Sequence, residues 1–315
     1  MKVRISNCVL SAPAGLTLVV LALVWSSPAE AQQIGHKVLG SLGLFAGSQP
    51  ESGLYVMDQF ASYGANEVFD REGHRLPVGL DVDALSNPIG FQMTFNLGRS
   101  VYMNVSAAAP IAHVSAQGSR PEASLDAFGL GDVYVQPAKV GWKMPQADIV
   151  ASYAFYAPTG LYVPRNGGIG LGQWTHEFSL GGTVYFDRAK AWNVSALGSY
   201  DLNQRKEGID ITRGDTIQVQ GGAGKTFRSD SKNFPRVDVG LVGYGLWQVR
   251  DDRGTALPSV LRGARDLDLG LGPELDLTIA PIRSRMSVRY CHDMAVKSRQ
   301  SGQILVIGIT ILARS

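Results

Sequence analysis

Residues 265–293 constrain the fold most, because charged and apolar residues alternate there almost one by one. A β-strand sends alternate side chains to opposite faces. The stretch therefore predicts two strands joined by a turn at Ala280-Pro281, each with one apolar and one charged face. In a soluble β protein the charged face would meet water, whereas in an outer-membrane barrel it lines the lumen and the apolar face meets lipid. The charged parity holds Asp266, Asp268, Glu274, Asp276, Arg283, Arg285 and Arg289.

The first 31 residues have the features of a signal peptide. Lys2 and Arg4 precede an apolar run from Ala14 to Trp25, and Ala29-Glu30-Ala31 offers a cleavage site. The run is shorter than the roughly 20 apolar residues that span a bilayer, so we expect residues 1–31 to be removed on export. No later stretch is long and apolar enough for a transmembrane helix, so the exported chain is either soluble or a β-barrel.

Composition narrows the class of protein further. Charged residues make up 18% of the chain, against about 25% in soluble domains, and the 37 glycines are spread throughout. A net charge of +2 argues against a nucleic-acid-binding surface. Cys291 is the only cysteine after the signal peptide, which excludes a disulfide framework.

Strand-like segments after residue 53 are separated by connections of alternating length. Long polar segments, such as 64–87 and 113–129, alternate with tight turns such as Gly98-Arg99. Outer-membrane barrels have long extracellular loops and tight periplasmic turns, whereas a soluble sandwich has no reason to place every long loop at one end. The pattern predicts an all-β fold, a transmembrane antiparallel up-and-down β-barrel of about twelve strands.

The barrel is predicted to occupy residues 53–315. The Gly- and Ser-rich segment 32–52 shows no clear period and is interpreted as an N-terminal tail or a small plug.

The charges decide which face meets lipid. An arginine on the lipid face costs about 2–4 kcal/mol at the bilayer midplane, so we expect Arg283, Arg285 and Arg289 to point into the lumen. There they would face the acidic residues of the preceding strand. A turn centred at Ala280-Pro281 places Asp276 near Arg285, where opposite charges attract across the hairpin.

Polar residues on the inward parity are the candidate solute-binding residues. The hairpin charges serve as structural pairs that fix the inner wall or as part of a solute path, and both interpretations stay open. An apolar solute would be expected to bind in an apolar pocket, whereas this predicted wall is polar. A channel for small polar or anionic solutes therefore fits the predicted lumen equally well. Besides the seven hairpin charges, the candidates are Tyr102, Asn104, Gln218, Gln220 and Tyr244.

Motifs for catalysis, metals or cofactors do not meet their structural requirements. Residues 221–226 resemble half of a phosphate-binding loop, but the first glycine is missing and the segment alternates like a strand. The five histidines are scattered and no cysteine cluster exists. His176 and Glu177 fall on opposite faces of a strand, and Ser179 has the wrong parity to act with His176 as a nucleophile. We therefore predict no enzymatic activity, no metal and no cofactor.

Ten stretches of the chain form a collinear series: residues 129–137, 153–160, 192–195, 200–203, 214–215, 240–244, Gln248, 251–254, 272–273 and 297–299. In order and spacing they are similar to the MetA-pathway of phenol degradation family of outer-membrane proteins, and the resemblance extends from Gly53 to the end of the chain. It implies a transporter-like barrel in the bacterial outer membrane, which passes small hydrophobic and often aromatic solutes, and it implies no catalytic residues.

The C-terminus departs from the usual barrel pattern. Outer-membrane barrels commonly end on an aromatic residue that the barrel-assembly machinery recognises, whereas this chain ends Ile311-Leu312-Ala313-Arg314-Ser315.

The leading prediction is a channel for passive uptake of phenolic-type compounds. Its expected partners are outer-membrane lipid, a small-molecule solute and the barrel-assembly machinery, with no nucleic acid. Twelve strands enclose a narrow lumen. Two alternatives stay open: a channel for small polar or anionic solutes such as oligosaccharides, and a plugged structural barrel without transport.

Overall fold

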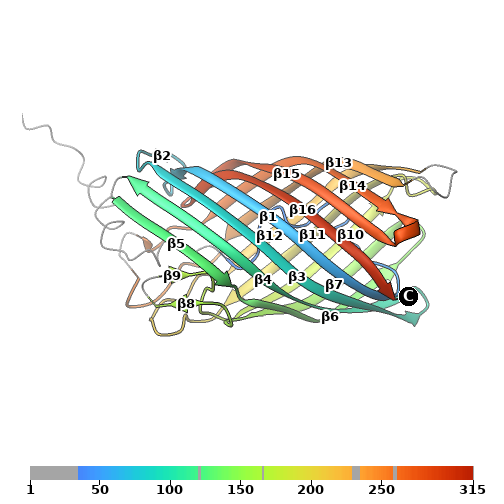
Figure 1. Cartoon of the computed structure of the whole chain (residues 1–315), viewed down its shortest axis with the longest axis horizontal. Coiled ribbons are helices and arrows are strands. Elements are labelled where there is room, and N and C mark those ends of the chain that lie inside the picture. The colour runs from blue at the N-terminus through green and yellow to red at the C-terminus, as the bar shows by residue number, and fades with distance from the viewer. Residues whose placement is uncertain (1–34, 120–121, 165–166, 229–234, 258–260, 315) are drawn as a thin grey trace, which may run out of the picture.

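The computed structural model describes residues 35–119, 122–164, 167–228, 235–257 and 261–314. Twelve antiparallel strands, each paired with its neighbours, close into a barrel in which the strands are tilted relative to the long axis (Figure 1). The predicted fold is therefore confirmed, while residues 1–34, which include the predicted signal peptide, lie outside the described residues. The strands of the ring are β1 (Gly53–Phe69), β3 (Leu80–Gly98), β4 (Val101–Ser119), β6 (Val133–Lys143), β7 (Ala147–Ala157), β10 (Thr175–Tyr185), β11 (Trp192–Asn203), β12 (Thr216–Phe227), β13 (Arg236–Gln248), β14 (Leu267–Ile279), β15 (Ser284–Lys297) and β16 (Gln300–Arg314).

The first and last strands close the ring. β1 pairs antiparallel with β16 from Leu54, opposite Arg314, to Val68, opposite Gln300. Lipid offers no hydrogen bonds to a free strand edge, so this seam satisfies backbone groups that would otherwise be unpaired in the membrane. Within the described residues, no helix is both long and apolar enough to cross a membrane.

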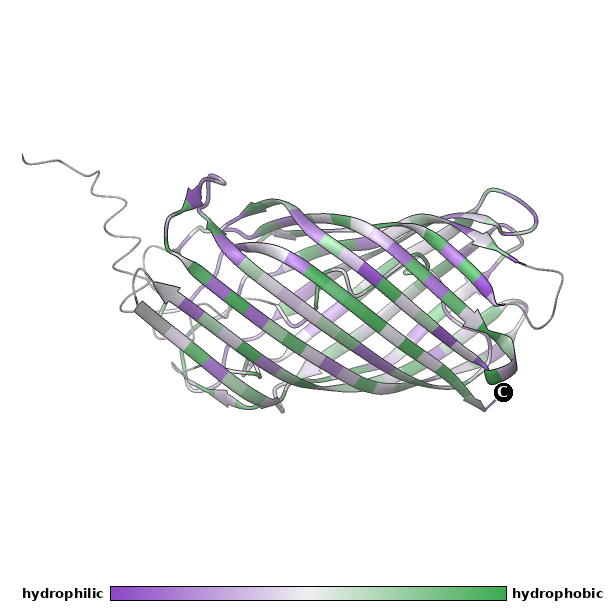
Figure 2. Cartoon of the chain, turned by 45° about the horizontal axis from the view of Figure 1, so that its top comes forward, coloured by the Kyte–Doolittle hydropathy of each residue, from purple (hydrophilic) through white to green (hydrophobic). Residues whose placement is uncertain are grey.

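The alternation of side chains places apolar residues outside and polar residues inside. Phe178 and Trp192 are 52% and 53% exposed, whereas Glu274 and Asp276 are 2% and 0% exposed. Figure 2 shows the resulting green and purple alternation along the strands. Because this polarity is opposite to that of a soluble β protein, the outer wall is suited to lipid.

Several strands continue well beyond the apolar part of the wall. The segments 64–87 and 113–129 were expected as long loops, but β1, β3, β4 and β5 (Glu122–Leu130) occupy most of them. Polar residues pair there in register, for example Asp81 with Gln117. The expectation was wrong because Pro77 and the many charged residues resemble a loop, although Leu80, Val82 and Ala84 alternate with Asp81 and Asp83 as in a strand. The loops that remain long lie at 158–174, 204–215 and 249–266.

The wall contains one break in a strand. β5 pairs with residues 111–119 of β4, and β6 pairs with residues 101–108 of the same strand. β5 and β6 therefore act as one long strand that is interrupted at Gly131 and Asp132. The short hairpin of β8 (Tyr162–Val163) and β9 (Gly167–Gly168) belongs to the loop beside this break. A two-residue strand, β2 (Arg75–Leu76), adds to the end of β1.

Lipid exposure of the outer face can be tested at the middle of β10. Leu180 is 66% exposed on that face, so Leu180→Arg should destabilise the folded barrel in lipid vesicles by about 2–4 kcal/mol. The measurement is the urea midpoint of folding into vesicles, with Leu180→Ala as the control that removes apolar surface without adding charge. An equal effect of both substitutions would argue that this face does not meet lipid.

Candidate functional site

The lumen is occupied by residues 35–52, here called the tail. The tail runs from His36, near the strand break, to Glu51, beside the tight-turn end of β6, and its contacts are with inward-facing residues of the wall. It joins the barrel through Gly53, whose φ of 151° is a conformation that side-chain-bearing residues rarely adopt. The tail is thus attached covalently at one end only within the described chain.

Leu44 is seated in a socket of glycines. Its side chain is 0% exposed, and a Cβ placed on Gly224 or Gly240 would lie 3.0 or 2.6 Å from its Cδ2 atom. Gly222 on β12 completes the socket, where a Cβ would lie 3.1 Å from the same atom. The glycine run of β12 that resembles half of a phosphate-binding loop therefore serves to admit a side chain of the tail.

An apolar stripe runs along part of the lumen wall, which the alternation in the sequence did not predict. Buried apolar residues on β1, β13, β15 and β16 form a stripe that packs against Leu39 and Leu44 of the tail. The stripe was missed because β16 is apolar on both parities, so alternation could not separate its two faces. Its members are Ala61, Val242, Leu246, Cys291, Ile304 and Val306.

Charged groups of the wall also hold the tail, from β10 and from β14 and β15, two strands that lie within or beside the stripe. Lys37 Nζ lies 2.8 Å from Glu177 Oε2 and donates to Ser199 Oγ at 2.9 Å. The backbone N–H of Leu44 donates to Glu274 Oε2 at 3.0 Å. Glu274 also pairs with Arg289 at 3.1 Å, and Arg289 donates to the backbone carbonyl of Ser41. Hydrogen bonds to charged groups contribute about 1.5–3 kcal/mol each, so the closed arrangement is well held.

His36 and Asp132 connect the end of the tail to the strand break. His36 Nε2 lies 2.8 Å from Asp132 Oδ2, and the His36 ring stacks on Tyr156 with centroids 4.7 Å apart. Asp132 also accepts the backbone N–H groups of Gly160, at 2.9 Å, and Leu171, at 2.7 Å. Asp132 therefore ties together the tail, the break and the loop at 158–174.

The pKa values at this junction follow from burial and these bonds. Burial lowers the pKa of His36, although Asp132 opposes the shift. Burial alone would raise the pKa of Asp132, but the hydrogen bonds from His36 and from the Leu171 backbone lower it below its ordinary value. At neutral pH the pair is therefore a neutral imidazole donating its Nε2 proton to a carboxylate.

Four of the seven hairpin charges form two ion pairs. Arg285 bonds Asp276 at 2.5 Å, although Asp276 lies opposite Ser287 in the β14–β15 ladder, and Arg289 faces Glu274. Arg283 differs from the expectation: it ends the short 3₁₀ turn Ala280–Ile282 with φ 51° and is exposed. The connection holds four residues, 280–283, rather than the two assumed, so Arg283 lies in the turn and outside the strand parity.

The remaining candidates are engaged in separate contacts along the wall. Asp266 pairs with Arg213 at 3.0 Å and Asp268 with Arg299 at 3.2 Å, both towards the loop end. Each of the others has its own partner: Asn104 bonds Thr94 and Gln136, Gln218 bonds Asp201, Gln220 accepts the N–H of Leu42, Tyr244 bonds Asp293, and the Tyr102 ring lies under Lys143.

Arg213 and Lys206 belong to the loop at 204–215, and no pattern in the sequence predicted that their side chains are buried. Arg213 is 1% exposed, and its Nε and Nη1 atoms have no hydrogen-bond partner. Burial, aided by Arg213, lowers the pKa of Lys206 to about 8. A loop residue's orientation depends on tertiary contacts rather than on strand parity, which is why neither residue could be predicted.

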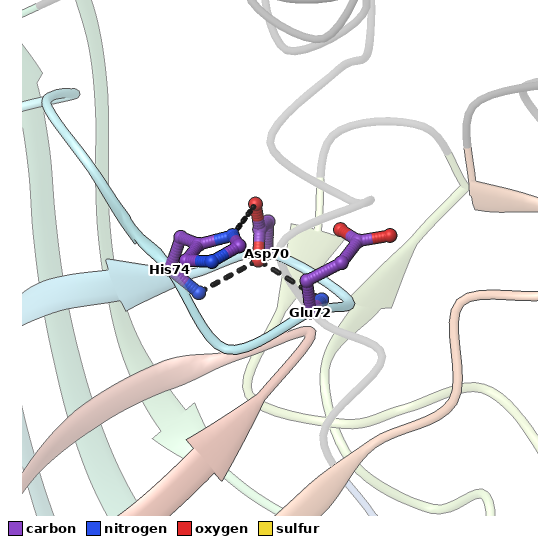
Figure 3. A group of neighbouring side chains, drawn as sticks. All are labelled: Asp70, Glu72 and His74. Atoms are coloured by element: carbon purple, nitrogen blue, oxygen red, sulfur yellow. Dashed lines mark hydrogen bonds and ion pairs between the residues drawn. The ribbon is translucent and has the colours of Figure 1, made fainter.

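A second group of polar residues lies on the surface, where β1 turns into β2. Asp70, Glu72 and His74 could each offer a ligand atom, all within 4.8 Å of one another (Figure 3). The carboxylate of Asp70 is already used by the turn: its Oδ1 accepts the N–H groups of Glu72 and His74 at 3.0 and 2.8 Å. These contacts explain the cluster as a turn stabilised by an aspartate.

His176 lies on the outer face. Tyr153 and Gln204 bond its two ring nitrogens at 2.8 and 2.9 Å, while the neighbouring Glu177 is buried on the lumen side. The two residues therefore face opposite sides of the wall, as their parity indicated.

Comparisons with known proteins agree with this architecture. A family model described as "Putative MetA-pathway of phenol degradation" matches residues 65–306. The fold is similar to the COG4313 outer membrane channel from Pseudomonas putida F1, with a TM-score of 0.70 and 12% identity over 84% of this chain and 97% of that one. It is also similar to the β domain of the Bordetella autotransporter BrkA, with a TM-score of 0.51 and 9% identity over 83% and 100%. No curated protein matches the chain.

Docking of the tail can be tested at Leu44. Leu44→Asn keeps the size of the side chain but places an amide in an apolar socket, so it should loosen the tail by about 2–5 kcal/mol. The measurement is the rate at which an added protease cleaves the tail in the folded barrel. Val38→Asn is the control, since Val38 is an exposed residue of the same tail. Equal cleavage of both variants would show that the socket does not hold the tail.

Lys206 predicts a dependence of stability on pH. Its folded pKa of about 8 lies below the ordinary value of 10.5, so the buried charge costs stability below pH 8, and this cost disappears as pH rises from about 8 to 10.5. Lys206→Met should therefore raise the free energy of unfolding at pH 7 by about 1–3 kcal/mol and gain less than the native chain between pH 7 and 10. Urea midpoints at both pH values decide this, and parallel pH profiles would contradict it.

Proposed function

The chain belongs to the family described as "Putative MetA-pathway of phenol degradation", and we propose from this that it lets small hydrophobic and aromatic solutes cross the bacterial outer membrane passively. A protein of the same fold from Pseudomonas putida F1 is named an outer membrane channel. Solutes of this class would enter the lumen once the tail has moved aside, without any enzymatic step.

The apolar stripe carries the proposal. Val242, Leu246, Ile304 and Val306 are 0–2% exposed, and the tail leucines Leu39 and Leu44 belong to the same buried cluster. Removing the tail would leave an apolar track beside a polar wall, and such tracks favour ligands that bury hydrocarbon surface. Burial of apolar area contributes a free energy of about 25 cal/mol per Å². An aromatic solute that replaces the leucines would gain binding free energy in this way.

The nature of the tail's contacts supports its movement. Its charged and polar contacts are with groups that water could solvate equally well, and such bonds have net values far below their strength in isolation. The tail can therefore leave the lumen at a cost that binding of a solute would reduce. We expect the barrel-assembly machinery to insert the barrel, with residues 1–31 removed beforehand.

Two other functions remain as outcomes of the test. Arg213 and Lys206 at the loop end would favour a small anion, but Asp266 and Asp252 lie close enough to both to offset much of their charge. A permanently plugged barrel would keep the tail in place under all conditions.

Deleting residues 35–50 tests the proposal. In vesicles whose outer leaflet is lipopolysaccharide, the deletion variant should admit 2-naphthol about tenfold faster than the full chain, with little gain for sucrose. Adding Val242→Asn to the deletion should reverse much of the gain, because it interrupts the apolar track. Equal entry of both solutes would favour a polar channel. Entry of 2-naphthol through the deletion variant but not through the full chain would favour a permanently plugged barrel, and no entry through either would contradict a channel.

A further inference from the structure

The ring of Phe45 in the tail lies within cation–π distance of two arginines of the wall. The guanidinium carbon of Arg236 is 5.2 Å from the centroid of the Phe45 ring, and that of Arg285 is 5.0 Å away. A cation within about 6 Å of an aromatic face is attracted by the ring quadrupole. Two such cations on one ring form a clamp, which holds Phe45 through its aromatic character.

The clamp stands at the tight-turn end of the barrel. Arg236 begins β13, and Arg285 follows the turn between β14 and β15. Their side chains are 36% and 39% exposed, so the clamp is open to solvent on one side. Phe45 itself is at a tight turn of the tail, where Ser48 N–H donates to its carbonyl at 3.0 Å.

Two carboxylates behind the clamp each have an oxygen without a partner. Asp238 Oδ1 accepts from Arg236 at 2.9 Å, and Asp276 Oδ2 accepts from Arg285 at 2.5 Å. Asp238 Oδ2 and Asp276 Oδ1 have no hydrogen-bond partner, although the two residues are 1% and 0% exposed. A buried carboxylate oxygen left unpaired is costly, and the phenyl ring of Phe45 has no proton to offer it.

We propose that this clamp is a binding site for a neutral aromatic solute with a hydroxyl group, and that Phe45 occupies it until such a solute arrives. The ring of the solute would take the place of Phe45 beside Arg236 and Arg285. Its hydroxyl would donate to a free oxygen of Asp238 or Asp276, a bond that Phe45 cannot make. The inference rests on the proposed function and names the substrate class that releases the tail.

The chemistry of the clamp predicts how ligands rank by affinity. A phenol offers both the aromatic face and the hydroxyl donor. Cyclohexanol offers the hydroxyl without the face, and benzoate offers the face with a carboxylate that would stand near two other carboxylates. Phenol should therefore bind best, by about tenfold over cyclohexanol, since a cation–π contact of 0.5–2 kcal/mol corresponds to that range.

The test labels position 45 with 4-fluorophenylalanine in the full chain and follows its fluorine resonance during titration. Phenol should shift the resonance to that of a solvent-exposed ring, with a half-saturation concentration about tenfold below that of cyclohexanol, and benzoate should act weakly. An equal response to phenol and cyclohexanol, or no response to phenol, would overturn the proposal.

A paired substitution provides a second test. Arg285→Met combined with Asp276→Asn removes the cation without leaving a buried carboxylate unpaired, so the barrel should fold. Phe45 and phenol both lose this contact, whereas cyclohexanol never makes it, so the preference for phenol over cyclohexanol should fall from about tenfold. An unchanged preference would contradict the clamp. Entry of 2-naphthol into vesicles through the variant lacking residues 35–50 is independent of Phe45. If entry occurs while the full chain shows no phenol response, the channel stands and the clamp fails.

Discussion

The pairing of β1 with β16 is the constraint on which the rest of the structure depends. A membrane offers no partner for a free strand edge, so the sheet must close on itself, and closure fixes which side of every strand is inside. Once closed, the barrel turns its leucines and aromatic residues to lipid and its carboxylates and guanidinium groups to the lumen. The charged groups then need partners within the lumen, which the opposing strands and the tail provide.

The tail contacts two kinds of surface in the lumen, one charged and one apolar. Lys37, Ser41 and the Leu44 backbone engage charged groups of the wall, whereas Leu39 and Leu44 cover the apolar stripe, which lies beside Glu274 and Arg289. Each contact is replaceable, because water suits the first set and hydrocarbon suits the second. A lumen lined by both kinds of surface is suited to a solute with both kinds of group, which is what distinguishes a phenol from a sugar or an alkane.

The barrel could be predicted from the sequence, whereas most of the site could not. Alternation over residues 265–293 determined the two strands and their charged faces, because these depend only on parity. The connection holds four residues rather than the two assumed, so the register differs by two residues and Arg283 lies in the turn. The apolar stripe was hidden in β16, whose two parities are both apolar, and the places of Leu44, Phe45 and Arg213 depend on segments without a period. Glycines at 222, 224 and 240 were visible as an anomaly, but only the seated leucine shows their purpose.

Gly53 marks the boundary between the tail and the wall. It is the first residue of β1 and pairs with Thr94, and its φ of 151° and the lack of room for a Cβ, which would lie 2.5 Å from Leu312 Cδ1, require glycine there. The ladder between β1 and β16 begins at the next residue, Leu54, so the tail takes no part in it. The lining of the pore and its frame can therefore vary separately, so that a sequence change before residue 53 would alter what passes while the frame keeps its integrity.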